Sequence, residues 1–403
     1  MLTERNTGNR GRCEQQSRRS GEENSEPHLS YTLTLLVVWI LIGLAVLLGL
    51  LSLAGERARA EYVARSLAHR LPDEACPPAT VIVPVKGLDE GLAANLAALE
   101  VLDYPDYELI VVARHESDVP HAAIPPDARL IYAGEGDPGT GEKINNLLAA
   151  VRAARPESHL FAFADSDGRV RSGWLRSLAA ALHRDAQAGA ATGYRWHIPP
   201  RGGVWPLLRS SWNAVIAGGF GPGNNGFVWG GAMAIRRETF QSARVAEYWH
   251  GKISDDFRLA QAVRDAGLRI AFAPGAMVAA RDHTTAPEFF EWIVRQMRIT
   301  RAYRPRLWWT GMIAHVVYCG AMVASVPFAP AALLVQFGLG MVKSRNRAVI
   351  ARSCFPDDAD WFERNGWVYT WTGPLVTWIW LYAFLGSAMS RRITWRGREY
   401  YLR

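Results

Sequence analysis

Two aspartates stand one residue apart directly after an apolar run. Asp165 and Asp167 follow the segment 160–164, which reads LFAFA and predicts a buried strand. Two carboxylates at a strand end can bind a divalent cation such as Mg²⁺ or Mn²⁺ together with substrate phosphate oxygens. A cation held there would neutralise a leaving diphosphate. An acidic turn without a function has the same composition, so the place at a strand end is what favours a metal site.

Three further aspartates suit either chemistry or helix capping. Asp89 lies in the run KGLD after the first predicted strand, where it can accept hydrogen bonds from a nucleoside or cap the next helix. Taken alone, capping is the stronger interpretation. Asp255 and Asp256 open a segment with helical spacing, and a carboxylate there can take a proton from an attacking hydroxyl or stabilise the helix N-terminus. The sequence leaves both alternatives open.

Arginines and a glycine-rich run complete the candidate residues. Arg295 and Arg298 lie at helical spacing just before an apolar block, so they can bind a diphosphate bidentately or meet anionic lipid headgroups. The run NGFVWGG contains Trp229, Gly230 and Gly231, and it either lets the backbone approach a ligand beside an aromatic ring or forms an ordinary loop.

A sheet is needed to bring these residues together. Apolar runs predict strands at 80–85, 107–113, 129–132 and 160–164, and helical spacing occurs at 92–99 and 144–154. Alternating strands and helices are typical of a mostly parallel sheet covered by helices. Ligands of such sheets bind beyond the carboxyl ends of the strands. The sequence therefore predicts an α/β fold with its acidic residues at one edge. No dinucleotide fingerprint, Walker loop or G-x-S-x-G elbow is present.

Three uncharged blocks flank this segment. The first, 33–54, has no charged residue over 22 positions, and as a helix it would rise roughly 33 Å, the thickness of a bilayer core. The block 307–341 is interrupted by Pro327 and Pro330, which predicts a helical hairpin. The block 366–390 is rich in Trp and Tyr and predicts another span.

The 403 residues are therefore expected to divide into eight segments. These are a disordered polar tail (1–30), a transmembrane anchor (31–55), a juxtamembrane linker (56–78), the α/β domain (79–306), a membrane hairpin (307–342), an interfacial segment (343–365), a transmembrane helix (366–390) and a basic C-terminal segment (391–403). Arginines beside the apolar blocks favour cytoplasmic faces, so an integral membrane protein with a cytoplasm-facing domain is expected. With a net charge of +7 and no basic binding motif, no nucleic-acid partner is expected.

The order of these motifs resembles the ceramide glucosyltransferase branch of the family 2-type, GT-A, inverting glycosyltransferases, which includes bacterial hopanoid-lipid relatives. The stretch 85–107, VKGLDEGLAANLAALEVLDYPDY, is similar to that family's K-G-x-D…N-L…L-D-Y-P-x-Y-E block. The element GEKINNL at 141–147 is similar to its K-x-N-N-L motif, and the C-terminal WRGREY to its W-R-x-x-x-Y ending. The resemblance covers roughly residues 33–403 and implies a GT-A fold in a bacterial inner membrane.

The resemblance also implies roles for the matching residues. They are donor binding by Asp89, Lys143, Asp165, Arg295 and Arg298, metal binding by Asp165 and Asp167, catalysis by Asp256 as base with Asp255, and an acceptor side at Trp229, Gly230 and Gly231. The implied activity is inverting transfer of a hexose from a UDP-sugar, UDP-glucose or a relative, to a ceramide-, hopanoid- or glycerolipid-like hydroxyl in glycolipid or sphingolipid metabolism.

One position departs from the family pattern. Ile299 stands where the (Q/R)-x-x-R-W motif has tryptophan, which leaves the acceptor open. A processive polysaccharide synthase is the alternative enzyme, although it needs several more spans than the three or four expected here. An inactive membrane scaffold is the alternative from another class, which Ile299 favours and the retained aspartates disfavour.

Overall fold

The computed structural model describes residues 8–395 and 398–402 of the chain. A seven-stranded sheet with the order β3-β2-β1-β4-β7-β5-β8 forms its centre. The strands are β1 (Ala79–Pro84), β2 (Tyr107–Ala113), β3 (Arg129–Tyr132), β4 (Leu160–Ala164), β5 (Ala188–Thr192), β7 (Ala232–Arg236) and β8 (Arg269–Phe272). β7 is antiparallel to both of its neighbours, whereas the other pairs are parallel. The predicted α/β fold with a mostly parallel sheet is confirmed.

Two small sheets accompany the central one. β6 (Arg195–His197) pairs in parallel with β9 (Val278–Ala280), and β10 (Arg392–Trp395) forms an antiparallel hairpin with β11 (Arg398–Tyr401). Strand prediction missed β5 to β9. The run AGAAT of β5 lacks the β-branched and aromatic residues that mark strands, and burial between neighbouring strands compensates for its weak propensity.

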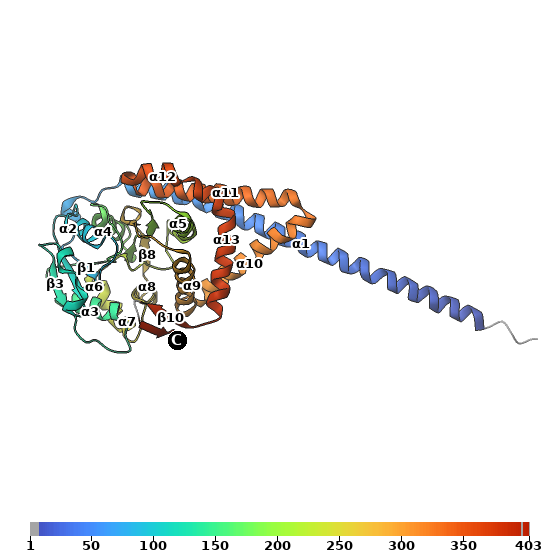
Figure 1. Cartoon of the computed structure of the whole chain (residues 1–403), viewed down its shortest axis with the longest axis horizontal. Coiled ribbons are helices and arrows are strands. Elements are labelled where there is room, and N and C mark those ends of the chain that lie inside the picture. Colours follow the sequence, from blue (N-terminus) through green and yellow to red (C-terminus); the bar gives the residue numbers. More distant parts are fainter. Residues whose placement is uncertain (1–7, 396–397, 403) are drawn as a thin grey trace, which may run out of the picture.

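Helices cover both faces of the central sheet (Figure 1). They are α2 (Leu92–Glu100), α3 (Glu142–Ala153), α4 (Trp174–Arg184), α5 (Val204–Ala217), α6 (Arg237–Ser242), α7 (Val245–Trp249), α8 (Asp255–Asp265) and α9 (Ala286–Tyr303). Short 3₁₀ turns lie at Asp73–Ala75, Glu116–Asp118, His121–Ala123, Pro274–Ala276 and Pro356–Asp358. Alternate residues of β1 enter different cores, with Val81 and Val83 in one cluster and Ile82 in the other, because successive strand side chains point to opposite faces.

Long helices lie along one side of this domain (Figure 1). They are α1 (Gly8–Ala68), α10 (Pro305–Phe328), α11 (Pro330–Cys354) and α13 (Trp367–Ala388), with the short α12 (Ala359–Asn365) between the last two. α10 and α11 meet at Ala329 as the predicted hairpin does, but α11 continues through residues that were expected to be interfacial. Among the described residues, Thr32–Ala68 and Pro305–Phe328 are long and apolar enough to cross a bilayer.

The N-terminal region differs from the expectation. α1 begins at Gly8, so the part of the predicted disordered tail from that residue onward is helical, while residues 1–7 of that prediction lie outside the described residues. α1 also continues to Ala68, so it includes most of the segment 55–72, for which the sequence predicts a short juxtamembrane helix. A polar segment can extend an existing helix without the cost of a new nucleus, which the composition of the tail does not reveal.

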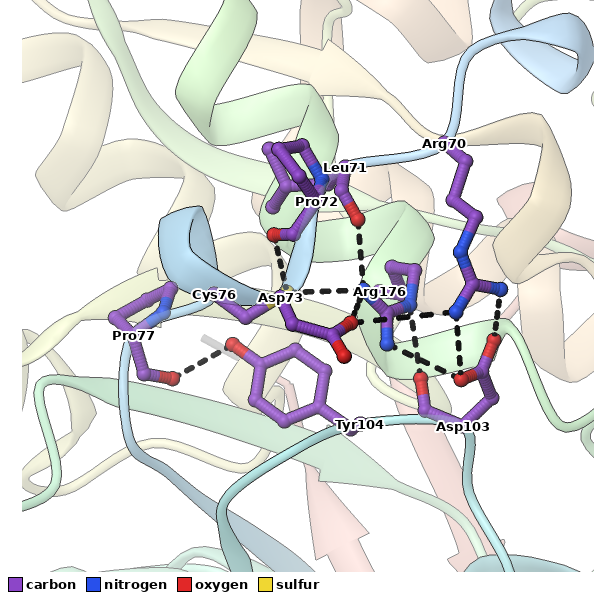
Figure 2. A network of polar contacts seen from close by, with 9 residues as sticks. All are labelled: Arg70, Leu71, Pro72, Asp73, Cys76, Pro77, Asp103, Tyr104 and Arg176. Carbon is purple, nitrogen blue, oxygen red and sulfur yellow. Dashed lines mark hydrogen bonds and ion pairs between the residues drawn. The ribbon is translucent and has the colours of Figure 1, made fainter.

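The rest of the linker is fixed to the domain by Arg176 of α4 (Figure 2). Its guanidinium donates to the backbone oxygens of Leu71 at 2.7 Å and Asp103 at 3.0 Å. Arg70 donates to the Asp103 carboxylate at 2.5 Å, and Tyr104 donates to Pro77 O at 2.6 Å. Two residues of the sequence motif L-D-Y-P therefore attach the end of α1 to the α/β domain.

Candidate active site

A cavity of about 490 Å³ opens where β1 and β4 end. Most of the predicted site residues line it, namely Lys143, Asp165, Asp167, Trp229, Gly230, Asp255, Asp256 and Arg295. They come from five separate stretches of the chain, which the parallel strands and the helix starts bring to one edge of the sheet. Three of the predicted site residues, Asp89, Gly231 and Arg298, do not line the cavity.

Lys143 joins two of the predicted aspartates. Its Nζ donates to Asp165 Oδ1 at 2.7 Å and lies 3.0 Å from Asp255 Oδ2. Burial by itself would lower the pKa of Lys143, but these two carboxylates outweigh it and hold the pKa above its usual value. Burial raises the pKa of Asp255 to about 6, although Lys143 opposes that change. The first turns of α3 and α8 are thus joined to the end of β4 by one buried cation.

Asp167 faces a second cation that sequence inspection did not identify. Arg195 Nη1 lies 3.2 Å from Asp167 Oδ2, and the guanidinium carbon lies 5.2 Å and 5.9 Å from the ring centres of Trp229 and Trp292. Burial raises the pKa of Asp167. For Arg195 burial acts to lower the pKa, and the nearby carboxylates of Asp167, Asp165 and Asp282 together outweigh burial and raise the pKa. The two aromatic rings hold the planar guanidinium in one orientation beside the carboxylate.

Near Arg195 lies a second cluster of charged residues that the sequence analysis did not identify, and its Asp282 carboxylate helps to raise the pKa of Arg195. Arg209 donates to Asp282 Oδ2 at 2.8 Å, and His197 Nδ1 lies 3.6 Å from Asp282 Oδ1. Burial and the nearby Arg209 lower the pKa of His197 to about 3, so its ring is neutral at physiological pH. These residues lie on β6, α5 and the segment after β9. Because no local pattern joins them, only the fold reveals the cluster.

Asp89 does not line the cavity but is hydrogen-bonded to Ser166, which does. Ser166 Oγ donates to Asp89 Oδ2 at 2.5 Å, and Asn95 Nδ2 donates to the backbone oxygen of Ser166 at 3.1 Å. The N-cap of α2 is Gly91, which has a φ of 76° and makes no side-chain cap. Side-chain capping by Asp89 is therefore not the role that the structure gives it. The carboxylate instead fixes the loop between Asp165 and Asp167.

At the start of α8, the side chains of the adjacent Asp255 and Asp256 have different surroundings. Ser254 is the N-cap, and its hydroxyl accepts a hydrogen bond from Phe257 N at 3.2 Å while donating to Asp256 Oδ1. Phe257 N also donates to Asp256 Oδ1 at 2.6 Å. Asp255 points into the buried pair with Lys143, whereas Asp256 is half-buried on the cavity wall. Neither aspartate is the N-cap residue.

The two glycines of the WGG run allow a close approach. A Cβ on Gly230 would lie 2.6 Å from Asp255 Oδ2, and one on Gly231 would lie 2.7 Å from Asp165 Oδ2. Any side chain there would displace a carboxylate of the site. Gly231 therefore packs behind the cavity wall, while Trp229 and Gly230 form part of it.

Arg298 is placed away from the cavity. Its Nη1 donates to the backbone oxygen of Arg392 in β10 at 3.0 Å, so it contacts the C-terminal hairpin. Arg295 lies one turn earlier on α9 and does line the cavity, as does Ile299. The arginines were predicted together, but their side chains leave α9 in different directions.

The carboxylates fit a divalent cation. Mg²⁺ in such sites is usually bound by one or two carboxylates together with substrate phosphates and water. Asp165 and Asp167 supply two carboxylates, and Asp167 Oδ1 is buried without a hydrogen-bond partner among the described residues. In the described part of the chain no group of three or more His, Cys, Asp or Glu side chains is arranged to hold a metal by itself. The donor phosphates would have to complete such a site.

The site thus gathers acidic residues at the strand ends of a mostly parallel sheet, beside the cations Lys143 and Arg195, an arrangement that suits a transferase with an α/β fold. Glycosyl transferase family 21 matches residues 37–403, so the chain belongs to that family. It is also 33% identical to Ceramide glucosyltransferase 1 of Caenorhabditis elegans over 104 residues, which are 23% of this chain and 22% of that protein. The match thus spans about a fifth of that relative.

Solved glycosyltransferases are also similar to this chain. A mannosyltransferase from Pyrobaculum calidifontis, PcManGT in complex with GDP-Man and Mn²⁺, has a TM-score of 0.45 and 17% identity over 87% of this chain and 98% of that one. S. aureus TarS in complex with UDP-GlcNAc has a TM-score of 0.36 and 12% identity over 80% and 96% of the two chains. The fold class follows from the chain's own strand order and from its family.

Proposed function

We propose that this glycosyltransferase moves a hexose from a UDP-sugar to the hydroxyl of a membrane lipid, with inversion at the anomeric carbon. One observation carries the proposal: Asp165, Asp167 and Asp256 line a single cavity. A diphosphate site and a candidate base are thereby close enough to act on one sugar. The partial likeness to a ceramide glucosyltransferase supports glucose and a hydroxyl lipid as donor and acceptor.

The donor diphosphate would lie between the aspartates and the buried cations. Asp165 and Asp167 would hold Mg²⁺ or Mn²⁺, and a bound cation would supply positive charge to the departing diphosphate. Lys143, Arg195 and Arg295 line the same cavity and would bind phosphate oxygens. Asp89 would act near the nucleoside by holding Ser166 in place.

Asp256 is the residue we assign as general base. Its Oδ1 is held by Ser254 and by Phe257 N, which orients the carboxylate, and Oδ2 would accept the proton of the acceptor hydroxyl. As that proton leaves, the acceptor oxygen forms its bond to the anomeric carbon. The bond from that carbon to the diphosphate oxygen breaks, and its electron pair leaves with UDP. A single displacement of this kind inverts the configuration. Asp255 would position Lys143 rather than touch the acceptor.

The long helices would anchor the enzyme in a bilayer. α1 exposes Leu36, Val37, Ile40 and Leu51, and α10 exposes Ile313 and Val326. Contiguous apolar surface of this kind is stable when lipid covers it. With the neighbouring arginines on the cytoplasmic side, the catalytic domain would face the cytoplasm, where nucleotide sugars occur. The acceptor chain would stay in the membrane while its hydroxyl reaches the cavity.

Transfer from labelled donor tests the proposal. Purified full-length protein would be incubated in detergent with UDP-[¹⁴C]glucose, Mg²⁺ or Mn²⁺ and a total lipid extract, and the products separated by chromatography. Labelled lipid with the inverted anomeric configuration is expected. Labelled polymer would favour a polysaccharide synthase instead, and the absence of any product with all hexose donors and both metals would favour an inactive scaffold.

A further inference from the structure

α9 stands between the cavity and the apolar helices. Glu288, Trp292, Arg295, Ile299 and Tyr303 recur at three- or four-residue intervals and line the cavity, so they occupy one face of the helix. The opposite face is buried: Phe289, Ile293 and Met297 pack with Trp308 of α10 and Phe384 of α13. One wall of the active site is therefore the helix that rests on the proposed membrane segment.

The C-terminal hairpin closes the cavity next to this wall. The end of α13 is attached to α9 by Arg301, which donates to the backbone oxygens of Ser387 at 3.1 Å and Ala388 at 2.8 Å. The chain then turns back as β10 and β11, and β10 lies against α9 (Figure 1). Arg298 of α9 donates to Arg392 O at 3.0 Å. Hydrogen bonds from α9 thus hold both the end of α13 and the first strand of the hairpin.

Side chains of β11 and the residue after it alternate between two environments. Tyr400 and Leu402 line the cavity, and Leu402 is only 3% exposed. Tyr401 between them is 62% exposed and faces away, as the alternation of a strand requires. Two residues at the very end of the sequence therefore belong to the active-site wall.

Tyr303, at the end of the α9 face that lines the cavity, lies next to the segment that carries the base. The Tyr303 hydroxyl accepts a hydrogen bond from Ile253 N at 3.1 Å, and its ring stacks on Phe257 with the centres 6.0 Å apart. Ile253 and Phe257 are on either side of Asp256 in the chain. A general base must lie within hydrogen-bond reach of the hydroxyl that it activates. An acceptor that lies along α9 and the hairpin would have its hydroxyl next to this base, with the donor at the strand ends.

We infer that Tyr400 and Leu402 form the acceptor subsite together with Ile299, an inference that rests on the proposed function. The subsite fits a lipid whose reactive hydroxyl lies at the junction of a polar head and an alkyl chain. The phenol of Tyr400 hydrogen-bonds to the head, and Leu402 and Ile299 contact the first methylenes of the chain. Tyrosine suits such a junction because its ring is apolar and its hydroxyl is polar. Arg298 acts as a positioning residue that holds the hairpin in place.

Matched variants of adjacent tyrosines test this inference. Transfer from UDP-[¹⁴C]glucose would be measured against increasing amounts of total lipid extract for Tyr400→Ala, Tyr400→Phe, Leu402→Ala and the control Tyr401→Ala, all in the full-length protein. We expect Tyr400→Ala and Leu402→Ala to raise the half-saturating amount of extract about tenfold, as loss of a buried contact and its hydrogen bond would do. Tyr400→Phe should recover part of the loss, and Tyr401→Ala should behave as the native protein.

Binding of labelled donor separates this role from a structural one. Equilibrium dialysis with UDP-[¹⁴C]glucose should give the native affinity for every variant, which would also show that the donor site has folded. Native lipid saturation in Tyr400→Ala, or weaker donor binding with unchanged lipid saturation, would overturn the inference and leave the proposed function standing. Failure of the native protein to label any lipid would instead reject the proposed function, and this inference with it.

Discussion

Lys143 donates to Asp165 at 2.7 Å, which joins the first turn of α3 to the end of β4 at the floor of the cavity. The same ammonium group lies 3.0 Å from Asp255, so one cation balances a buried carboxylate and the half-buried Asp165. Removing one partner of a buried charge cluster leaves the others uncompensated. The geometry of the donor site therefore depends on this lysine as well as on the aspartates.

Replacing Lys143 with Met should reduce kcat/KM by about 100-fold or more, because a phosphate-binding charge is lost and two carboxylates are left to repel each other. Steady-state transfer assays would measure the effect. Arg152→Ala provides the control, since Arg152 lies on the same helix with an exposed side chain. If Lys143→Met and Arg152→Ala lost equally little activity, the lysine would have no part in donor binding.

Replacing Asp256 with Asn should lower kcat by about 10³-fold, in the range found for loss of a general base, while donor affinity changes little. Single-turnover transfer and equilibrium dialysis with labelled UDP-sugar would measure the two quantities separately. Asp265→Asn at the exposed far end of α8 is the matched control. A parallel loss of donor binding in Asp256→Asn would assign this carboxylate to the donor rather than to the acceptor proton.

Chelation should stop transfer reversibly. EDTA is expected to abolish turnover, and added Mn²⁺ or Mg²⁺ should restore it, because two carboxylates without a third protein ligand bind the cation weakly. Asp167→Asn should raise the metal concentration required for half-maximal activity by about tenfold, since it removes one of the two ligands. Turnover that continues in EDTA would remove the metal from the mechanism and leave Lys143, Arg195 and Arg295 as the charges facing the diphosphate.

Asp255 should make the stability of the protein depend on pH. Its pKa is raised from 3.8 to about 6 in the folded protein, so the folded state binds more protons than the unfolded state between these values. The contribution of Asp255 to stability is therefore present below about pH 4 and is lost as the pH rises through about 6. This loss amounts to about 3 kcal/mol at most.

Asp255→Asn removes that titration. Thermal unfolding in detergent between pH 4.5 and 7.5 should show the Tm of Asp255→Asn rising relative to the native protein up to about pH 6 and then running parallel to it. A relative Tm that falls with increasing pH would show that the Asp255 carboxylate is stabilised, not destabilised, by its surroundings.

Local sequence patterns predicted the parts of the site that follow directly from an element. Asp165 and Asp167 were placed at a strand end because the apolar run before them is unmistakable, and Asp256 was placed at a helix start because the spacing after it is helical. The missing predictions concern longer distances. Arg195 and Asp282 carry no local signal, and no local pattern reveals the contact of Arg298 with the hairpin.

The sequence by itself determined the family, the α/β fold class and the carboxylates of the site, because hydrophobic periodicity and motif spacing depend on near neighbours in the chain. Only the tertiary structure decided which side chains meet across long stretches. Arg209 contacts Asp282 and Arg298 contacts Arg392, in each case across more than seventy residues. Such contacts depend on how helices and strands pack, so the acceptor wall formed by Tyr400 and Leu402 emerges only when the chain is folded.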